Sequence, residues 1–429
     1  MSAANRGAGR PNRGRTVAGR GIGGAVASSI VVAAGLLAGA ALPAVAEAQV
    51  AIRGEVVHPV AGPAINDGVV LIGDDGKIEA VGPADEVSIP DGYRTLSGAV
   101  VTPGLVDARS VVGLAGYLNQ PHDQDQMDLS SAIQPELRAI DAYNARETLV
   151  AWLRNHGVTT VHTGHAPGPL VSGQTMIVKT RGENVDEAVI EPVTMVAMTL
   201  GRDATRVSDD APGSRPNAMA MLRQELIRAS EYAEHREGDD PPARNLRLET
   251  LAGVLAGEIR ILVTAHHAAD IITALRLRRE FDLDMVLDGA AEAHLVVDEI
   301  REAGVPVILH PPLARYAGAL EHGTFESARI LNNAGIPVTI QSGYEPYVPK
   351  ARVVLFEAAP LLGHGLSFDE TLSLVTIDAA RILGIDDRVG TLEPGKDGDV
   401  AIFDGDPFEY ISRVCGVVIE GRVVSEECH

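Results

Sequence analysis

Polar side chains with catalytic or ligand-binding chemistry stand at the ends of several short apolar runs of this chain. His266, Asp288 and His310 each close such a run, and Arg109 closes another. Imidazole and carboxylate groups bind divalent metals and transfer protons, whereas a guanidinium binds anions. If these runs are neighbouring strands, their ends meet at one edge of a sheet. The chain therefore offers parts of a metal site, a proton-transfer site or an anion-binding pocket.

Four histidines have two interpretations, and both stay open. In the first they form a metal site, and in the second they form a hydrogen-bonded pocket without a metal. Imidazoles that bind a metal are oriented by further hydrogen-bond partners, and the sequence does not indicate such partners for these four. We therefore expect the pocket without a metal. The four residues are His162, His165, His266 and His310.

Arg109 is a candidate of a different kind. Its guanidinium stays protonated in proteins and cannot ligate a metal cation. It can either form a structural ion pair with Asp288 or bind an anionic ligand. The sequence contains no Gly-x-Ser-x-Gly signature of a nucleophilic serine and no glycine-rich loop that would hold a phosphate.

The elements that must position these side chains follow from the alternation of apolar and helical segments after Gly98. Short strands that alternate with helices predict a parallel sheet, and eight such units suit a closed (β/α)8 barrel over residues 99–384. The expected strands are 99–107, 158–163, 174–180, 194–200, 260–265, 284–288, 305–310 and 336–341. The expected helices are 145–155, 217–235, 268–281, 292–303 and 366–383.

Both ends of the mature chain are rich in β pattern instead. Asp75-Gly76 between two apolar runs is a hairpin signal within residues 49–98, and further strands are expected within residues 385–429. Neither end has enough strands to be stable alone. We therefore predict a small composite β-sandwich domain built from both ends.

Composition and charge restrict the partners. The chain has 429 residues, 45% hydrophobic and 22% charged, with a net charge of −22. Such an acidic chain argues against a nucleic-acid partner, because phosphate binding needs a basic face. Residues 1–20 contain arginines and no acid, and residues 21–46 carry no charge and end in small residues. This pattern predicts a bacterial signal peptide over residues 1–48 and a periplasmic or secreted protein; an uncleaved membrane anchor is the alternative.

The chain has two cysteines, Cys415 and Cys428, both near its end. A hairpin around Glu420-Gly421 would bring them near each other, and export would let a disulfide persist. A disulfide and two free thiols both remain open.

Several motifs of the chain resemble the amidohydrolase superfamily, and within it the imidazolonepropionase-related group. They are residues 73–82, Thr102 to Ala108, 376–384 and 390–407. The resemblance implies a (β/α)8 barrel with a composite β-sandwich, and ancestry among metal-dependent hydrolases of amide-like C–N bonds. In such hydrolases the metal activates a water molecule at the carboxyl ends of the strands.

The chain departs from the metal-binding pattern that this resemblance implies. Strand one has Arg109 and Val111 in place of two histidines. Strand five keeps His266 but has Thr264 in place of its first histidine. Gly289 stands where strand six has a histidine, and Gly343 stands where strand eight has an aspartate. Lys179 resembles a family lysine at the end of strand three, where it binds a substrate carboxylate or caps the strand.

These observations lead to one main expectation and one alternative. We predict an exported amidohydrolase-like pseudoenzyme that has lost metal-dependent hydrolysis and holds no cofactor. It would be a non-catalytic binder of a small-molecule ligand or a partner subunit of an active relative. The alternative is an active C–N hydrolase with a rebuilt, mononuclear zinc site. A homo-oligomer or a hetero-oligomer is compatible with both, and membrane contact is expected only if the signal segment stays uncleaved. No catalytic residue is assigned, and the expected substrate-binding residues are Arg109, Lys179, His266, Asp288 and His310.

Overall fold

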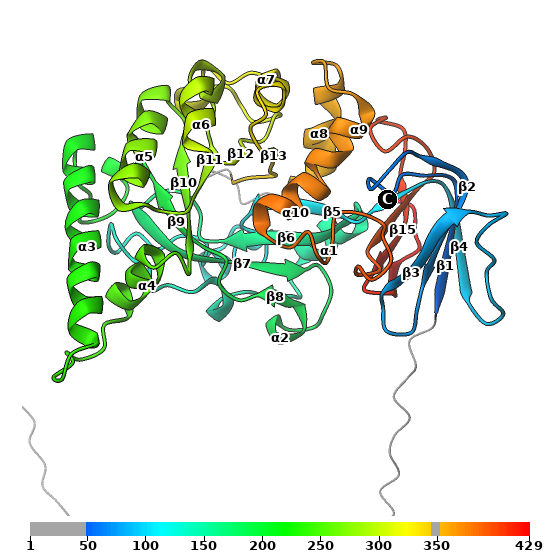
Figure 1. Cartoon of the computed structure of the whole chain (residues 1–429), viewed down its shortest axis with the longest axis horizontal. Helices are drawn as coiled ribbons and strands as arrows, with labels where there is room; N and C mark the ends of the chain where they lie inside the picture. The colour runs from blue at the N-terminus through cyan, green and yellow to red at the C-terminus, as the bar shows by residue number, and fades with distance from the viewer. Residues whose placement is uncertain (1–48, 345–351) are drawn as a thin grey trace, which may run out of the picture. The chain divides into compact units, whose positions relative to one another are not determined.

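The computed structural model describes residues 49–344 and 352–429, all within one compact unit. The predicted signal peptide, residues 1–48, lies outside the described residues. The strands form two sheets (Figure 1). They are β1 Val50–Val57, β2 Ile65–Ile72, β3 Ile78–Pro83, β4 Arg94–Pro103, β5 Leu105–Ser110, β6 Val158–Gly164, β7 Val171–Lys179, β8 Val189–Glu191, β9 Met195–Thr199, β10 Arg260–Ala265, β11 Met285–Gly289, β12 Val307–Leu309, β13 Val338–Ile340, β14 Val400–Phe403, β15 Val414–Ile419 and β16 Arg422–Ser425.

The first sheet combines strands from both ends of the described chain, in the order β16-β15-β14-β4-β1-β2-β3. In the hairpin between β2 and β3, Gly76 has a φ of 74° and the side chain of Asp75 accepts a hydrogen bond from the amide of Lys77 at 2.9 Å. Strands β14 and β4 pair antiparallel and join the two ends. Cys415 of β15 and Cys428 form a disulfide bond.

The second sheet is the barrel, in the order β13-β12-β11-β10-β9-β7-β6-β5 with β8 beside β7. The amide of Gly343 donates to the carbonyl of Arg109 at 3.0 Å, which brings the chain after β13 to the end of β5 and nearly closes the sheet. The predicted fold class, a barrel with a smaller composite β domain, is confirmed.

One barrel strand runs against our expectation of a wholly parallel sheet. Strand β7 pairs antiparallel with both β6 and β9. Only residues 165–170 separate β6 from β7, and a parallel crossover needs a dozen or more residues. The carboxyl end of β7 therefore lies at the end of the barrel where its parallel neighbours begin.

Two predicted elements are each divided. The expected strand 99–107 is broken at Pro103-Gly104, so that β4 joins the composite sheet and β5 joins the barrel. The expected helix 366–383 is interrupted around Thr376, where the backbone leaves the helical region. The helices are α1 Thr148–Asn155, α2 Val185–Ala188, α3 Arg215–Arg236, α4 Leu246–Leu255, α5 Ala268–Phe281, α6 Val297–Ala303, α7 Ser327–Asn333, α8 Val354–Leu362, α9 Phe368–Leu374 and α10 Ile377–Leu383.

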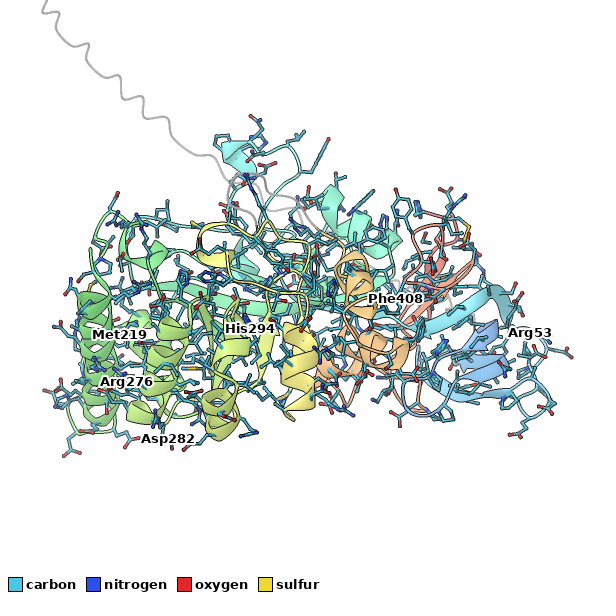
Figure 2. All side chains as sticks on the ribbon, turned by 90° about the horizontal axis from the view of Figure 1, so that it is seen from above. Arg53, Met219, Arg276, Asp282, His294 and Phe408 are labelled. Carbon is cyan, nitrogen blue, oxygen red and sulfur yellow. A yellow bond between two sulfur atoms is a disulfide. The ribbon has the colours of Figure 1, made fainter. Side chains whose placement is uncertain are left out.

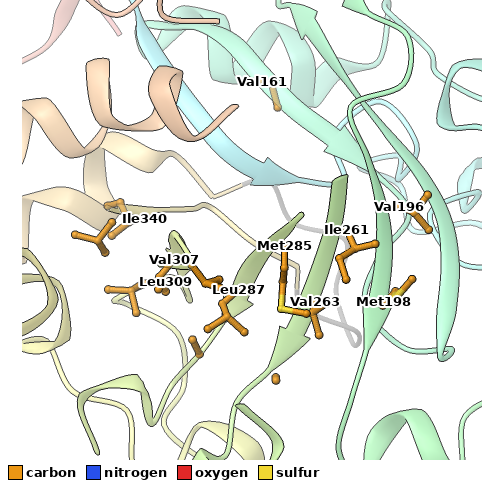
Figure 3. Packing of buried hydrophobic residues seen from close by; sticks show 14 of the residues in the cluster. Val161, Val196, Met198, Ile261, Val263, Met285, Leu287, Val307, Leu309 and Ile340 are labelled. Carbon is orange, nitrogen blue, oxygen red and sulfur yellow. The ribbon is translucent and has the colours of Figure 1, made fainter. Parts of the chain in front are cut away.

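The barrel strands pack side chains on both faces, as their nearly continuous apolar sequences predict. Figure 3 shows one face, where residues such as Val263 and Leu287 belong to the large core cluster that includes the helices. The alternate residues Leu262, Val286 and Ile308 form a separate cluster with α10. Because side chains on a strand repeat every second residue, Thr264, Asp288 and His310 share the face of this second cluster. This inner face leads to the site described next.

Across residues 49–344 and 352–429, no helix combines the length and apolar character that crossing a membrane requires.

Candidate active site at the mouth of the barrel

A pocket of about 280 Å³ opens at the carboxyl ends of the parallel barrel strands. Four of the five expected substrate-binding residues line it: Arg109, His266, Asp288 and His310. Its volume is close to the lower bound for small-molecule pockets. Enzymes built on (β/α)8 barrels bind their substrates at this end of the barrel. The positions compared with the family pattern, 109, 111, 264, 266, 289 and 343, all line the same pocket.

Asp288 is a fixed carboxylate in the wall of this pocket. It is buried, its Oδ2 accepts a hydrogen bond from the hydroxyl of Thr264, and its Oδ1 accepts one from Nε2 of Gln341 at 2.7 Å. Both oxygens are therefore already held by neutral donors. Our sequence analysis did not select Gln341, although its place directly after β13 would have marked it as a residue of the barrel mouth.

Arg109 brings a buried positive charge to the pocket. Its side chain is 3% exposed and donates to the main-chain carbonyls of Ser110, at 3.3 Å, and His165. No carboxylate of the described chain lies within 4.0 Å of its guanidinium, so the ion pair with Asp288 is not formed. Burial lowers the pKa of Arg109, while Asp288 and Asp107 oppose that shift from a longer distance.

His310 can accept a proton. Its Nδ1 lies 3.0 Å from the carbonyl oxygen of Pro311, which can only accept, so Nδ1 carries the hydrogen and Nε2 has the lone pair. Burial lowers the pKa of His310 to about 4, with a further contribution from His266. The imidazole is therefore neutral at neutral pH.

The two glycines at family metal positions are enclosed by their neighbours. Gly289 and Gly343 have positive φ angles of 76° and 73°, which side chains other than glycine rarely adopt. A Cβ at position 289 would overlap the ring of His266, and one at position 343 would lie 2.5 Å from Cγ of Pro311. His266 and Pro311 thus fill the space that larger residues at these positions would need.

The remaining candidates lie elsewhere. Both ring nitrogens of His162 are occupied, at 2.7 Å from the carbonyl of Ala108 and 2.7 Å from the hydroxyl of Thr175. The buried ring of His165 packs against Gly173 and does not line the pocket. Only His266 and His310 of the four histidines meet in it.

Lys179 lies at the opposite end of the barrel, because β7 runs antiparallel. It is 1% exposed, and its Nζ contacts Asp399 at 2.7 Å and Asp397 at 3.1 Å. This lysine joins the barrel to the segment that leads into β14.

The sequence matches the family model described as Amidohydrolase family over residues 100–424. The chain belongs to the amidohydrolase family. It therefore belongs to a superfamily of hydrolases that act on small molecules, and the resemblance noted from its motifs is confirmed.

Individual relatives agree with this membership. The chain is 23% identical to Amidohydrolase tasK of Hapsidospora irregularis over 80% of its own length, but it spans only 38% of that protein. It is 24% identical to an imidazolonepropionase of Rhizorhabdus wittichii, covering 82% of this chain and 91% of the relative. A crystal structure of an amidohydrolase from Thermotoga maritima superposes with a TM-score of 0.82 at 26% identity, over 88% of this chain and 100% of that one.

The comparisons contradict our expectation that the protein has no cofactor. A metal at this pocket is what family membership implies, and an adenosine deaminase of Xanthomonas campestris with a TM-score of 0.51 was solved with bound zinc. That structure is 16% identical, over 89% of this chain and 93% of its own, and its likeness concerns the fold alone. The expectation, which was drawn from ligands missing on three strands, is therefore wrong for a member of this family.

The side chains at this mouth nevertheless do not fit the metal that the family implies. Within residues 49–344 and 352–429, no three His, Cys, Asp or Glu side chains are grouped so that they could hold a metal ion. Arg109 and Val111 offer no lone pair, and both oxygens of Asp288 accept hydrogen bonds.

Proposed function

We propose that the protein is an active hydrolase that cleaves a C–N bond of a small molecule bound in this pocket, with a rebuilt set of side chains. One observation carries the proposal. A neutral buried histidine, a fixed carboxylate and a buried guanidinium converge at the end of the barrel where members of a hydrolase family bind their substrates.

In this proposal His310 is the general base. Nε2 of the neutral imidazole takes a proton from a water molecule, whose oxygen attacks the carbonyl carbon of the substrate. The imidazolium then returns the proton to the leaving nitrogen as the C–N bond breaks. Asp288, held by Thr264 and Gln341, supplies a fixed carboxylate in the wall of the same pocket, where it can orient the substrate.

A second candidate is ligand binding without turnover, alone or as a partner subunit. Arg109 and Val111 favour it, because they stand where the family places two histidines on the first strand. Both candidates place a small molecule in the same pocket and differ in whether product appears.

The deciding experiment is a turnover assay with the purified protein. Amides, lactams and imidazolones are supplied, each with added zinc and with chelator. We expect His310→Gln to lower kcat by about 100-fold, the usual contribution of a general base. His235→Gln, at an exposed position outside the pocket, is the matched control. The wild-type rate should fall only as the pH drops towards about 4, where His310 becomes protonated.

Two outcomes of this assay would count against hydrolysis. Binding of a substrate with no product under any condition would favour the second candidate. An unchanged kcat in a folded His310→Gln variant would remove the proposed base.

We also propose that the protein is exported and that residues 1–48 are removed. The arginine-rich start followed by an uncharged run is typical of a signal peptide, and the Cys415–Cys428 disulfide suits an oxidising compartment. Fractionation of expressing cells with N-terminal sequencing tests this. A cytoplasmic protein that retains Met1 or Ser2 would contradict it.

A further inference from the structure

The charge balance of the pocket differs from that of the whole chain. Asp and Glu outnumber Lys and Arg by 58 to 36 in the whole chain. Among the described residues, the pocket lining reverses this, with three arginines, Arg109, Arg315 and Arg352, and one carboxylate, Asp288. Arg352 is paired with Glu357 at 3.0 Å, whereas Arg315 is exposed at the rim. An acidic protein that gathers cations around one small cavity has a pocket suited to an anion.

The deepest of these cations, Arg109, has donors to spare. A guanidinium has five N–H groups, and within residues 49–344 and 352–429 Arg109 uses two of them, on the carbonyls of Ser110 and His165. Those carbonyls orient the group but carry no net charge. A buried charge without a carboxylate within 4.0 Å is costly unless a ligand supplies the opposite charge.

Two carboxylates, Asp288 and Asp107, act on the charge of Arg109 from a longer distance, and both accept hydrogen bonds from other groups. Asp288 holds Thr264 and Gln341 through its two oxygens. Asp107 accepts from the amides of Ser342, at 3.0 Å, and Arg109, at 3.3 Å, and burial raises the pKa of Asp107 to about 6. Neither carboxylate reaches the guanidinium, so its charge is balanced only from a distance.

We propose that Arg109 binds the carboxylate of the ligand, so that the pocket selects small amides that carry a carboxylate. A planar carboxylate matches the planar guanidinium in size and charge, and both fit a cavity of about 280 Å³. The inference rests on the proposed function for the amide and on the geometry of Arg109 for the carboxylate. It assigns a binding role to a residue that stands where the family has a metal-binding histidine.

The test compares matched probes that differ only in charge. N-acyl amino acids and their primary amides are titrated into the full-length mature protein, and the shift in melting temperature and the heat of binding are measured. We expect the carboxylates to bind and the matched amides to bind about 30-fold more weakly or not at all. Inorganic phosphate is a third arm; if it binds more tightly than every carboxylate, the carboxylate assignment is wrong.

Variants separate Arg109 from general charge effects. Arg109→Gln should remove the preference for carboxylates, and Arg109→Met provides the same test if the glutamine variant fails to fold. Arg276→Gln, on α5 and exposed, should leave the preference unchanged; Figure 2 shows Arg276 among the barrel helices, well apart from Arg53 on the composite sheet. A preference that persists in both Arg109 variants overturns the proposal.

Failure of this inference and failure of the proposed hydrolysis can be told apart. Carboxylates that bind through Arg109 and are never cleaved refute hydrolysis and leave the binding role intact. Turnover that is equal for carboxylates and amides, and unchanged in Arg109→Gln, refutes the binding role and leaves hydrolysis intact.

Discussion

The two ends of the barrel each bury a positive charge, and they treat it in opposite ways. At the end that faces the β14 segment, Lys179 is 1% exposed and contacts Asp397 and Asp399. At the mouth, Arg109 is 3% exposed and contacts main-chain carbonyls only. The two cations are almost equally buried, but Lys179 contacts carboxylates, whereas Arg109 contacts uncharged main-chain carbonyls.

The difference separates a structural charge from one that is available to a ligand. Asp397 also contacts Lys77 at 2.6 Å and Arg388 at 3.1 Å, so the far end is a closed network of charges. Such a network holds two parts of the chain together and has no charge left for a ligand. In the part of the chain that the structure describes, Arg109 has no such network, and it lines a cavity.

The largest effect is expected at the closed network. Lys179→Met removes the one cation that contacts Asp399 within the described chain and leaves a buried carboxylate without a counter-charge. We expect the free energy of unfolding to fall by about 3–5 kcal/mol, as for other buried pairs that lose one partner. Urea denaturation measures it, with Arg276→Gln as the control. A loss below about 1 kcal/mol would mean that the network is not what joins these segments.

A second prediction concerns the pH dependence of folding stability, which we expect to have opposite directions at the two ends of the barrel. Burial raises the pKa of Asp107 at the mouth to about 6, above its unfolded value of 3.8. Asp107 therefore stabilises the fold at acid pH, and that stability is lost as the pH rises through about 6. Relative to Asp107→Asn, the wild type should lose roughly 2 to 2.5 kcal/mol between pH 4 and pH 7.5.

Asp397 at the far end is the counterpart for this pH experiment. Burial alone would raise the pKa of Asp397, but Lys179, Lys77 and Arg388 outweigh it and hold the pKa below its usual value. The wild type should therefore gain stability over Asp397→Asn as the pH rises through the lowered folded pKa towards the unfolded value of 3.8, and should keep that gain at higher pH. The same direction of change at both ends would break the contrast.

A third prediction supplies the mouth with the carboxylate that the family pattern has there. Gly343→Asp places a Cβ at a φ of 73° and 2.5 Å from Pro311. Gly335→Asp is a matched control, because Gly335 also has a φ of 73° and no atom within 4 Å of its Cβ position. We expect Gly343→Asp to be less stable than this control by about 1–3 kcal/mol, the cost of an overfilled site. Equal or greater stability would indicate that Arg109 accepts a protein carboxylate readily.

The same two ends show how much of the fold could be predicted from the sequence alone. The alternation of strands and helices was sufficient for the barrel, since strands buried on both faces have continuous apolar sequences. The direction of β7 was predictable as well, because residues 165–170 are too few to form a parallel crossover. Treating β7 as parallel placed Lys179 at the mouth, and the antiparallel strand places it at the other end.

Site residues at the ends of strands could be predicted from the sequence. Roles that depend on contacts between distant segments could not. Arg109, His266, Asp288 and His310 follow from strand ends, and the structure brings them together. The saturation of His162 depends on a carbonyl of another strand, which no spacing reveals. The same holds for the pairing of Lys179 with aspartates some 220 residues later in the chain.

The smallest effect on stability is expected at Arg109 itself, and it decides the contrast. If Arg109 had a structural role, Arg109→Met would destabilise the protein as Lys179→Met does. Arg109→Met leaves no carboxylate without a partner. It removes two hydrogen bonds to main-chain carbonyls, which is destabilising, and it also removes an uncompensated buried charge, which is stabilising. These contributions oppose each other, so we expect the free energy of unfolding to change by less than about 1 kcal/mol in either direction. Urea denaturation of both variants side by side measures the difference, and a fall of 3 kcal/mol or more in Arg109→Met would make both cations structural.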